Sequence, residues 1–440
     1  LVAEGHKESK ILEAQAEKQS AILAAEAEKE AKIREAEGEA EAIAKVQKAT
    51  ADAIKMLNEA NADESVLKLK ALEAFAKAAD GQEAGAEGEV FVLGGIGPIT
   101  GAGAAYGESV RNGAELAVKE INEAGGINGY QVEFYFEDDE NDAEKSVNAY
   151  NTLKDKGMQM LVGTTTSKPC IAVGAESAAD NMFQLTPSGS AVQCVENENV
   201  FRVCFSDPDQ GKKSAEYIAD NGLAKKIAII YDSSSEYSDG IRETFVETAE
   251  EKGLEIVASE AFTADSNTDF SVQLDKAKEA GAELVFLPIY YQEASIILKQ
   301  ASDKDFHPMF FGCDGMDGIL SVKNFDQSLA EGLMLLTPFT VDEAGSQDFV
   351  AAYEEAYGIE PLQFGAGAYD AVYAIKEAAE KAGVTPDMEV SDMCEAMKTA
   401  MTEITIDGLT GEGMTWNANG EPEKAPKAAK IVSGVYEMMD

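Results

Sequence analysis

Residues 90–126 read Val90-FVLGGIGPITGAGAAYGESVRNGAELAVKEINEAG-Gly126, and this stretch decides the fold. Its apolar start, Val90 to Ile96, predicts a buried strand, and Ser109 to Glu123 has the amphipathic spacing of a helix. A glycine-rich loop joins the two segments. A strand that leads through a loop into a helix is the repeating unit of α/β proteins.

The same alternation continues along the chain. Further strands are predicted at Gln131-VEFYFE, Met160-LVG, Lys226-IAIIYD and Glu283-LVFLPI, and further helices at Ala143–Lys156, Gly240–Lys252 and Gln292–Ser302. This order predicts doubly wound parallel sheets with helices on both faces. Because roughly 350 residues are more than a single hydrophobic core usually contains, we expect two lobes joined by a hinge. Ligands of such folds bind in a crevice at the carboxyl ends of the strands.

The composition is strongly acidic, with 81 Asp and Glu against 36 Lys and Arg and a formal charge of −45. Such a charge repels nucleic acid and anionic lipid, so neither is an expected partner, and it favours a cationic or zwitterionic ligand. The sequence contains no run of about 18 apolar residues, so no membrane span is predicted. The chain starts at Leu1 without a signal peptide, which indicates a processed, truncated or engineered chain.

The cysteines and histidines predict neither a metal site nor a catalytic pair. The two histidines, His6 and His307, are far apart, and no C-x-x-C occurs among the five cysteines. We therefore expect no cofactor and no enzyme activity. Cys194 and Cys204 flank a polar stretch that could turn a short hairpin, and either a disulfide or two buried thiols fits them.

The first 80 residues differ in composition from the rest of the chain and consist mainly of Ala, Glu and Lys. Ile11, Ile22 and Ile33 recur with a period of 11 residues. That period predicts an almost straight apolar stripe along one long helix, which requires partner helices for burial. We expect self-association through residues 1–80, followed by a flexible acidic linker at residues 81–89.

This N-terminal segment resembles the C-terminal helical tail of stomatin/prohibitin-type scaffold proteins. The residues that carry the resemblance are Ala36-EGEAEA-Ile43, Val46-QKATADAIKMLNE-Ala60 and Glu64-SVLKLKALEA-Phe75. The resemblance implies oligomerisation through the segment. Its composition differs so much from the rest that a graft or a fusion is indicated.

Three loops beyond the linker carry the candidate binding groups: Gly94-GIGPITGAGAAY-Gly107, Gly163-TTTSK-Pro169 and Thr186-PSGS-Ala191. The last two are rich in hydroxyls and offer backbone N–H groups, which suits a ligand carboxylate. The same residues could serve only as helix caps. Gly95-Ile-Gly97 is not a dinucleotide fingerprint, because Thr100 stands where its third glycine belongs.

From Val90 onward the chain resembles the leucine/isoleucine/valine-binding receptors, the type I periplasmic binding proteins of ABC transporters. The motifs that carry this resemblance include Gly97-PIT-Gly101, Gly113-AELAVKEINEAGGIN-Gly129, Thr186-PSGS-Ala191, Asp207-PDQ-Gly211, Phe310-FGCD-Gly315, Ala368-YDAVYAIKE-Ala378 and Trp416-NAN-Gly420. The resemblance implies a two-lobed fold. It places the lobes at residues 90–206 with 339–411 and at residues 207–338 with 412–440.

The same resemblance implies a site. Ser167, Ser188 and Ser190 match positions that hold the α-carboxylate of an amino acid and share its ammonium group. Asp314 matches the acidic partner of that ammonium, where these receptors usually have Glu. Tyr290 contributes from the second lobe, and Tyr106 and Tyr237 wall the ligand side chain.

We therefore expect an extracytoplasmic protein that delivers an amino acid, most simply a branched-chain aliphatic one, to an ABC transporter permease. A receptor for an amide, a short peptide or an aromatic acid is an alternative within the same class. A signalling or scaffold protein assembled through residues 1–80 is the alternative from a different class.

Overall fold

The computed structural model describes residues 89–424 and 426–439, all of which belong to one compact unit, Glu83–Asp440. The predicted long helix, its resemblance to stomatin/prohibitin tails and the self-association expected of it lie outside the described residues. So does the predicted linker, apart from Glu89.

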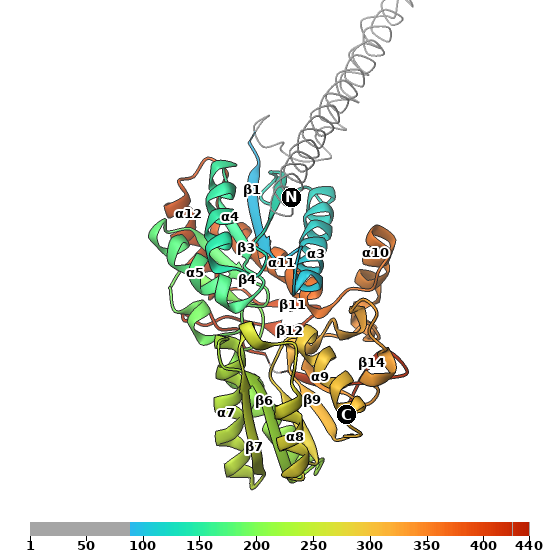
Figure 1. Ribbon diagram of the computed structural model, residues 1–440. Coiled ribbons are helices and arrows are strands. Elements are labelled where there is room, and N and C mark those ends of the chain that lie inside the picture. Colours follow the sequence, from blue (N-terminus) through green and yellow to red (C-terminus); the bar gives the residue numbers. More distant parts are fainter. Residues whose placement is uncertain (1–88, 425, 440) are drawn as a thin grey trace, which may run out of the picture. The chain divides into compact units, whose positions relative to one another are not determined.

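The first lobe is built on a five-stranded, wholly parallel sheet in the order β2-β1-β3-β4-β5. Its strands are β1 (Phe91–Gly97), β2 (Val132–Asp138), β3 (Met160–Gly163), β4 (Phe183–Thr186) and β5 (Val200–Arg202). The helices between them are α3 (Ala104–Glu123), α4 (Ala143–Asp155) and α5 (Ser167–Ala179). Figure 1 shows α4 and α5 on one side of this sheet and α3 on the other.

The second lobe contains a seven-stranded sheet in the order β14-β13-β10-β9-β8-β6-β7. Five strands are parallel: β6 (Lys226–Asp232), β7 (Glu255–Phe262), β8 (Leu284–Leu287), β9 (Met309–Gly312) and β10 (Met334–Thr337). Helices α6 (Asp207–Asp220), α7 (Glu236–Lys252), α8 (Ser271–Glu279) and α9 (Tyr291–Asp303) accompany them.

The sequence predicted a parallel sheet here, but the second sheet is only partly parallel. Strands β13 (Lys427–Val432) and β14 (Val435–Met438) form a hairpin that pairs antiparallel along β10. Ser433 and Gly434 make the turn with φ values of 54° and 82°, which suits a tight two-residue hairpin. Two strands joined by so short a turn can only run antiparallel.

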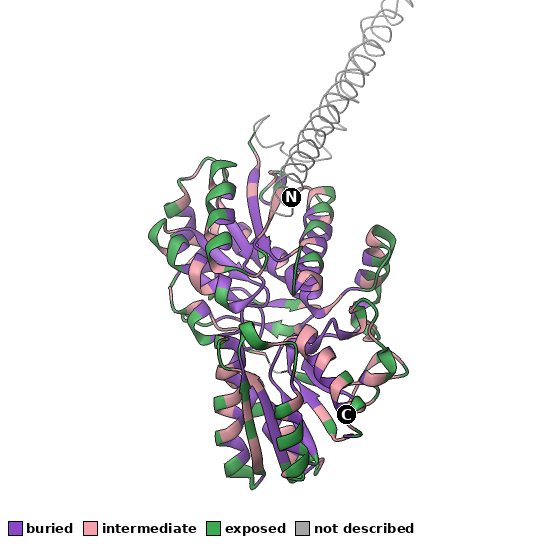
Figure 2. Ribbon diagram, in the orientation of Figure 1, coloured by how far each residue is buried: buried purple, intermediate pink, exposed green. Residues whose placement is uncertain are grey.

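Alternate residues of the strands face opposite helix layers. In β6, Ile227 and Ile229 join the same buried cluster as Phe245 of α7. Ala228 and Ile230 point to the other face and share a cluster with Ile297 of α9. This period of two within an almost continuous apolar run is the pattern of a sheet buried on both sides. Figure 2 shows the buried strands between helices whose outer faces are exposed.

Later segments return to the first lobe. Helix α10 (Gln347–Tyr357) is followed by α11 (Gln363–Ala382) and α12 (Val390–Met401), and the small β11–β12 ribbon comes next (Ile406–Gly408 and Gly411–Met414). A Cβ on Gly113 of α3 would lie 2.1 Å from the carbonyl oxygen of Gly365 in α11, so these helices touch backbone to backbone. The structure therefore confirms the two-lobed α/β fold.

Three local predictions were wrong. Helix α7 begins at Glu236 rather than Gly240, because the Ser235 side chain caps it by accepting the Ser238 N–H. Helix α3 begins at Ala104 rather than Ser109, because Gly103 adopts a left-handed φ of 93° and ends the loop earlier. The stretch between Cys194 and Cys204 is not a hairpin. A short 3-10 helix, η1 (Val192–Val195), leads into β5, which pairs parallel with β4. The Asn199 amide holds this connection by donating to the Met182 carbonyl at 2.7 Å.

Candidate functional site

The carboxyl ends of the two sheets carry the seven side chains predicted for ligand binding. The first lobe contributes Tyr106 from the first turn of α3, Ser167 from the start of α5, and Ser188 and Ser190 from the loop after β4. The second lobe contributes Tyr237 from the first turn of α7, Tyr290 just before α9, and Asp314 at the start of the 3-10 helix η3 (Asp314–Met316). All are buried except Tyr290, which is partly buried.

The hydroxyl loops of the first lobe are fastened to one another. The Ser167 Oγ accepts the backbone N–H groups of Ser190 at 3.2 Å and Ala191 at 3.1 Å. This leaves the Ser167 hydroxyl proton available at the N-terminus of α5, where helix N–H groups also favour an anion. Ser188 donates its own hydroxyl to the Thr165 carbonyl at 2.6 Å, so its oxygen is left as an acceptor.

A buried arginine holds the loop after β4 from behind. The Arg202 guanidinium donates to the carbonyl oxygens of Gly189 and Ser190 and forms an ion pair with Glu421 at 3.0 Å. Thr186 also ties the loop down, because its Oγ1 accepts the Gly189 N–H at 2.7 Å. A loop fixed in this way needs little reorganisation when it binds a ligand.

Asp314 is the acidic group of the second lobe. Its Oδ1 accepts the Tyr237 hydroxyl at 2.8 Å, and its backbone N–H donates to Gln210 Oε1 at 3.0 Å. Burial raises the pKa of Asp314 to about 6, although the Tyr237 and Gln210 hydrogen bonds act in the opposite direction. A cationic ligand group would favour the ionised carboxylate.

A second carboxyl lies between the lobes, and the sequence analysis gave it no role. Asp207 begins α6, is 1% exposed, and neither of its oxygens has a hydrogen-bond partner among the described residues. Its backbone N–H donates to the Ser190 carbonyl at 2.9 Å, which places it beside the hydroxyl loop. Burial raises the pKa of Asp207 well above its usual range, and the nearby Ser190 hydroxyl offsets this only in part. Such a group favours a hydrogen-bonding or cationic partner, and the described residues supply none.

Tyrosines join the lobes across the site. Tyr106 of the first lobe donates its hydroxyl to the Gly315 carbonyl and accepts the Tyr291 N–H at 3.3 Å. The Tyr106 and Tyr290 rings pack edge to face with centroids 5.5 Å apart, and the Tyr237 and Tyr290 rings lie 4.9 Å apart. The three predicted tyrosines therefore form one aromatic wall. Tyr291 adds another contact between the lobes, because its hydroxyl accepts the Ala105 N–H at 3.4 Å.

Two cavities are lined by residues of the predicted site. Ser188 and Asp314, from opposite lobes, line a common space of about 10 Å³, roughly the room that one water needs. A larger space of about 600 Å³ lies against Tyr237 and Tyr290 and is also lined by Lys168 of the first lobe. The hydroxyl loop and the acidic turn thus line the same small space, and the aromatic wall borders a separate, wider one.

Gln363 is another residue that the sequence analysis missed. It lies at the start of α11 and donates its side-chain amide to the Asp314 carbonyl at 2.9 Å, while its backbone N–H donates to Asp317 at 2.8 Å. Asp207 had a usable signal, since it stands in the quoted Asp207-PDQ-Gly211 motif. Gln363 had none, because 49 residues separate it from Asp314.

The cysteines are free thiols in the structure, and all five are buried. Cys194 packs with Cys170 in a small cluster and forms no disulfide with Cys204. Of the two possibilities that the sequence left open, the structure has the buried thiols. No group of three or more potential metal ligands occurs among the described residues, and no described helix combines the length and apolarity needed to cross a bilayer.

Two α/β lobes with a polar, tyrosine-walled site between the ends of their sheets define a solute-binding receptor. The chain belongs to the periplasmic binding protein family, whose model matches residues 90–434. The members of this family are substrate-binding proteins, not enzymes.

Relatives agree with this assignment. The Leu/Ile/Val-binding protein homolog 3 of Brucella melitensis is 30% identical over 323 residues, which cover 73% of this chain and 87% of the relative. The branched-chain amino acid transporter substrate-binding protein LivJ of Streptococcus pneumoniae, solved with isoleucine, matches with a TM-score of 0.73 and 27% identity, covering 80% of this chain and 99% of that protein. A Rhodopseudomonas palustris solute-binding protein, solved with benzoate, has a TM-score of 0.70 and 19% identity. The match covers 80% of this chain and 95% of that protein, and at this identity it supports only the fold.

Proposed function

We propose that this protein binds a branched-chain amino acid outside the cytoplasm and delivers it to an ABC transporter. The observation that carries the proposal is the Asp207 carboxyl, whose two buried oxygens have no partner among the described residues. A ligand ammonium between Asp207 and Asp314 would satisfy both groups, which lie near enough for each charge to affect the other. The Leu/Ile/Val-binding name of the Brucella relative and the isoleucine in LivJ support the choice of ligand.

In this proposal the ligand lies across the two lobes. Its carboxylate takes the Ser167 and Ser190 hydroxyls and the N-terminus of α5, and Ser188 accepts from the ammonium. Its side chain packs against Tyr106, Tyr237 and Tyr290. A zwitterion held at one end by each lobe stabilises closure, because only the closed form makes both sets of contacts.

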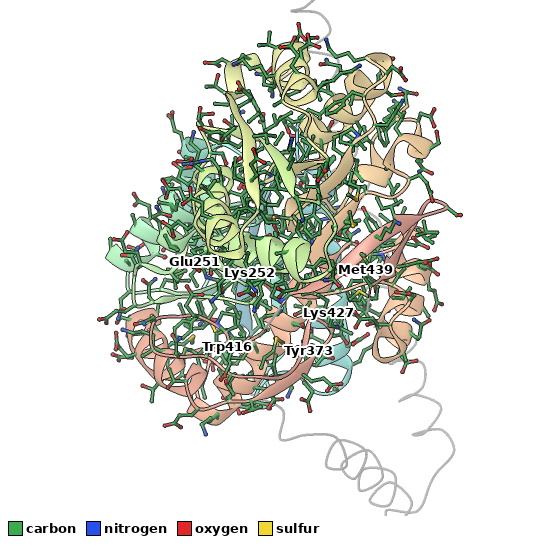
Figure 3. All side chains as sticks on the ribbon, turned by 90° about the horizontal axis from the view of Figure 1, so that it is seen from below. Glu251, Lys252, Tyr373, Trp416, Lys427 and Met439 are labelled. Carbon is green, nitrogen blue, oxygen red and sulfur yellow. The ribbon has the colours of Figure 1, made fainter. Side chains whose placement is uncertain are left out.

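The predicted lobe limits remain part of the proposal, except for the last crossing between the lobes. The first lobe takes residues 90–206 and 339–411, and the second takes residues 207–338 and 412–440. Trp416, labelled in Figure 3, donates its indole N–H to the Arg202 carbonyl at 2.7 Å, and the Arg202 N–H donates to the Gly420 carbonyl at 3.0 Å. These two bonds favour a last crossing between the lobes after Gly420 rather than at residue 411.

The test is a binding panel on protein stripped of ligand by unfolding and refolding. We expect leucine, isoleucine or valine to raise the melting temperature, since a ligand that binds only the folded state stabilises it by mass action. D-leucine is the matched control, and benzoate, a leucine dipeptide and leucinamide represent the alternative ligands. If none of the twenty amino acids shifts the transition while one of these alternatives does, the branched-chain proposal is wrong.

A further inference from the structure

Two thiols lie directly behind the hydroxyl loops. Cys170 belongs to the first turn of α5, and Cys194 belongs to η1. Both have no exposed surface, and with Ala191 they form a small cluster of their own. The site described above uses neither thiol.

The two sulfurs contact the segments that carry the ligand hydroxyls. The Cys194 Sγ donates to the Ser167 carbonyl at 3.6 Å. A Cβ on Gly189 would lie 3.1 Å from the Cys170 Sγ, so this sulfur sits immediately under the loop after β4. Any change at these sulfurs therefore reaches Ser167 and the loop that contains Ser190 without an intervening layer.

The surroundings distinguish the two thiols. The Gln184 amide donates to the Cys170 Sγ at 3.6 Å. The neighbouring Cys194 side chain lowers the pKa of Cys170, and the Arg202 guanidinium acts in the same direction. Burial raises the pKa of Cys194 well above its usual range. Cys170 is thus the better nucleophile of the pair, because the thiolate is the reactive form.

We propose that Cys170 and Cys194 form a reversible disulfide that lowers the affinity of the adjacent ligand site. A low-molecular-weight disulfide is the oxidant. The Cys170 thiolate attacks one of its sulfurs, a mixed disulfide forms, and the first small thiolate leaves. The Cys194 thiolate then attacks the Cys170 sulfur and releases the second. Two protein thiols are oxidised, the small disulfide is reduced to two thiols, and the two protons pass to them.

The bond would move the ligand loops. A sulfur–sulfur bond is about 2.0 Å long, much shorter than a non-bonded contact, so α5 and η1 must shift toward each other. The Ser167 Oγ then loses its alignment with the N–H groups of Ser190 and Ala191. We expect affinity for the amino acid to fall about tenfold, as for one lost hydrogen bond to a charged group. Because both thiols are buried, oxidation requires local opening and should take minutes to hours.

The experiment incubates the ligand-free full chain with oxidised glutathione, blocks the remaining thiols under denaturing conditions and maps the peptides. We expect one linked peptide pair, Cys170 with Cys194, and alkylated Cys204, Cys313 and Cys394. Leucine titrations of reduced, oxidised and re-reduced protein should show the loss and its recovery. Cys170→Ser and Cys194→Ser should each abolish the response, whereas Cys394→Ser, in α12, should keep it.

The affinity measurement rests on the proposed function, and the peptide map does not. Reduced protein that binds no amino acid contradicts the proposed function. A linked Cys170–Cys194 pair with unchanged leucine affinity overturns the switch, as does a map in which both thiols stay alkylated. Should a serine variant fail to fold, recovery of affinity on reducing the oxidised natural chain decides the question.

Discussion

The Tyr237 hydroxyl donates to Asp314 Oδ1 at 2.8 Å and accepts the Gly315 N–H at 3.0 Å. This one hydroxyl fixes the acidic turn after β9 to the start of α7. A Cβ on Gly315 would lie 2.7 Å from the same hydroxyl, so the turn depends on glycine at this position. The position of the Asp314 carboxylate is therefore set by the second lobe before any ligand arrives.

Replacing this carboxylate is the direct test of its role. Asp314→Asn keeps the size of the side chain but removes its charge. Because the desolvated ammonium of the ligand then loses its charged partner, the free energy of binding should weaken by about 3–5 kcal/mol, which is about two to four decades in affinity. Ser190→Ala should cost less, about 1–3 kcal/mol, because the N-terminus of α5 still binds the carboxylate. Calorimetric titration with leucine measures both, and Asp326→Asn, an exposed acid of the same lobe, is the control. An Asp314→Asn protein that binds like the parent would reduce Asp314 to a turn residue.

Affinity should also depend on pH. Burial raises the pKa of Asp314 to about 6 in the ligand-free protein, and the ammonium favours the ionised form. Below pH 6, binding must release a proton, so affinity should fall by about tenfold for each further unit of acidity. The stability of the free protein has the opposite sign: the contribution of Asp314 is complete below pH of about 4 and is lost as the pH rises through 6. Titrations between pH 5 and 7 should show this slope in the parent and a flatter one in Asp314→Asn.

Tyr106 should contribute to closure. Tyr106→Phe keeps the ring that packs on Tyr290 but removes the hydrogen bonds to Gly315 and Tyr291. Loss of these two bonds between the lobes should lower affinity by about thirtyfold, since each neutral bond contributes about 1 kcal/mol. Small-angle scattering with leucine present should then show a larger open fraction. Tyr130→Phe, far along the same lobe, provides the comparison. Equal affinity and equal scattering for Tyr106→Phe would mean that other contacts close the lobes.

The features that could be predicted depend on residues close together in the sequence, whereas the missed features depend on contacts between residues far apart in it. Strands β1, β3 and β6 could be predicted because a buried parallel strand is a short apolar run in the sequence itself. The serines and Tyr106 lay in loops that the pattern located, but the roles of all seven site residues, Tyr237 and Tyr290 included, came from the resemblance to the leucine/isoleucine/valine-binding receptors. The orphaned state of Asp207 depends on burial by both lobes, and the Gln363 contact joins residues far apart in sequence. Cys170 and Cys194 likewise meet only because α5 and η1 pack together.

The N-terminal segment gives a modular prediction. A chain without residues 1–82 keeps the whole compact unit that contains both sheets. We expect its leucine affinity to stay within about twofold of the parent, and any oligomer seen by light scattering to shrink if the 11-residue stripe drives association. Loss of binding on truncation would show that the segment and the receptor are coupled.

Replacing Asp207 distinguishes a role in ligand binding from a role in the stability of the fold. The Asp207 carboxyl is buried and neither oxygen has a hydrogen-bond partner among the described residues, a state that costs stability. Asp207→Asn removes the titrating group without changing the volume, and its new amide can donate toward Ser190. We expect the free energy of unfolding of the ligand-free protein to rise by about 1–3 kcal/mol. Leucine affinity should fall at least tenfold, because the ammonium loses a charged partner.

These opposite signs are what a group selected for binding rather than for stability should show. Denaturant unfolding with and without leucine measures both effects on one sample. Asp370→Asn is the matched control, because Asp370 is equally buried but accepts three hydrogen bonds from Leu409 and Thr410. That change should destabilise the protein. An Asp207→Asn protein that is less stable and binds leucine normally would make Asp207 a structural residue and would remove the main support for the proposed ligand position.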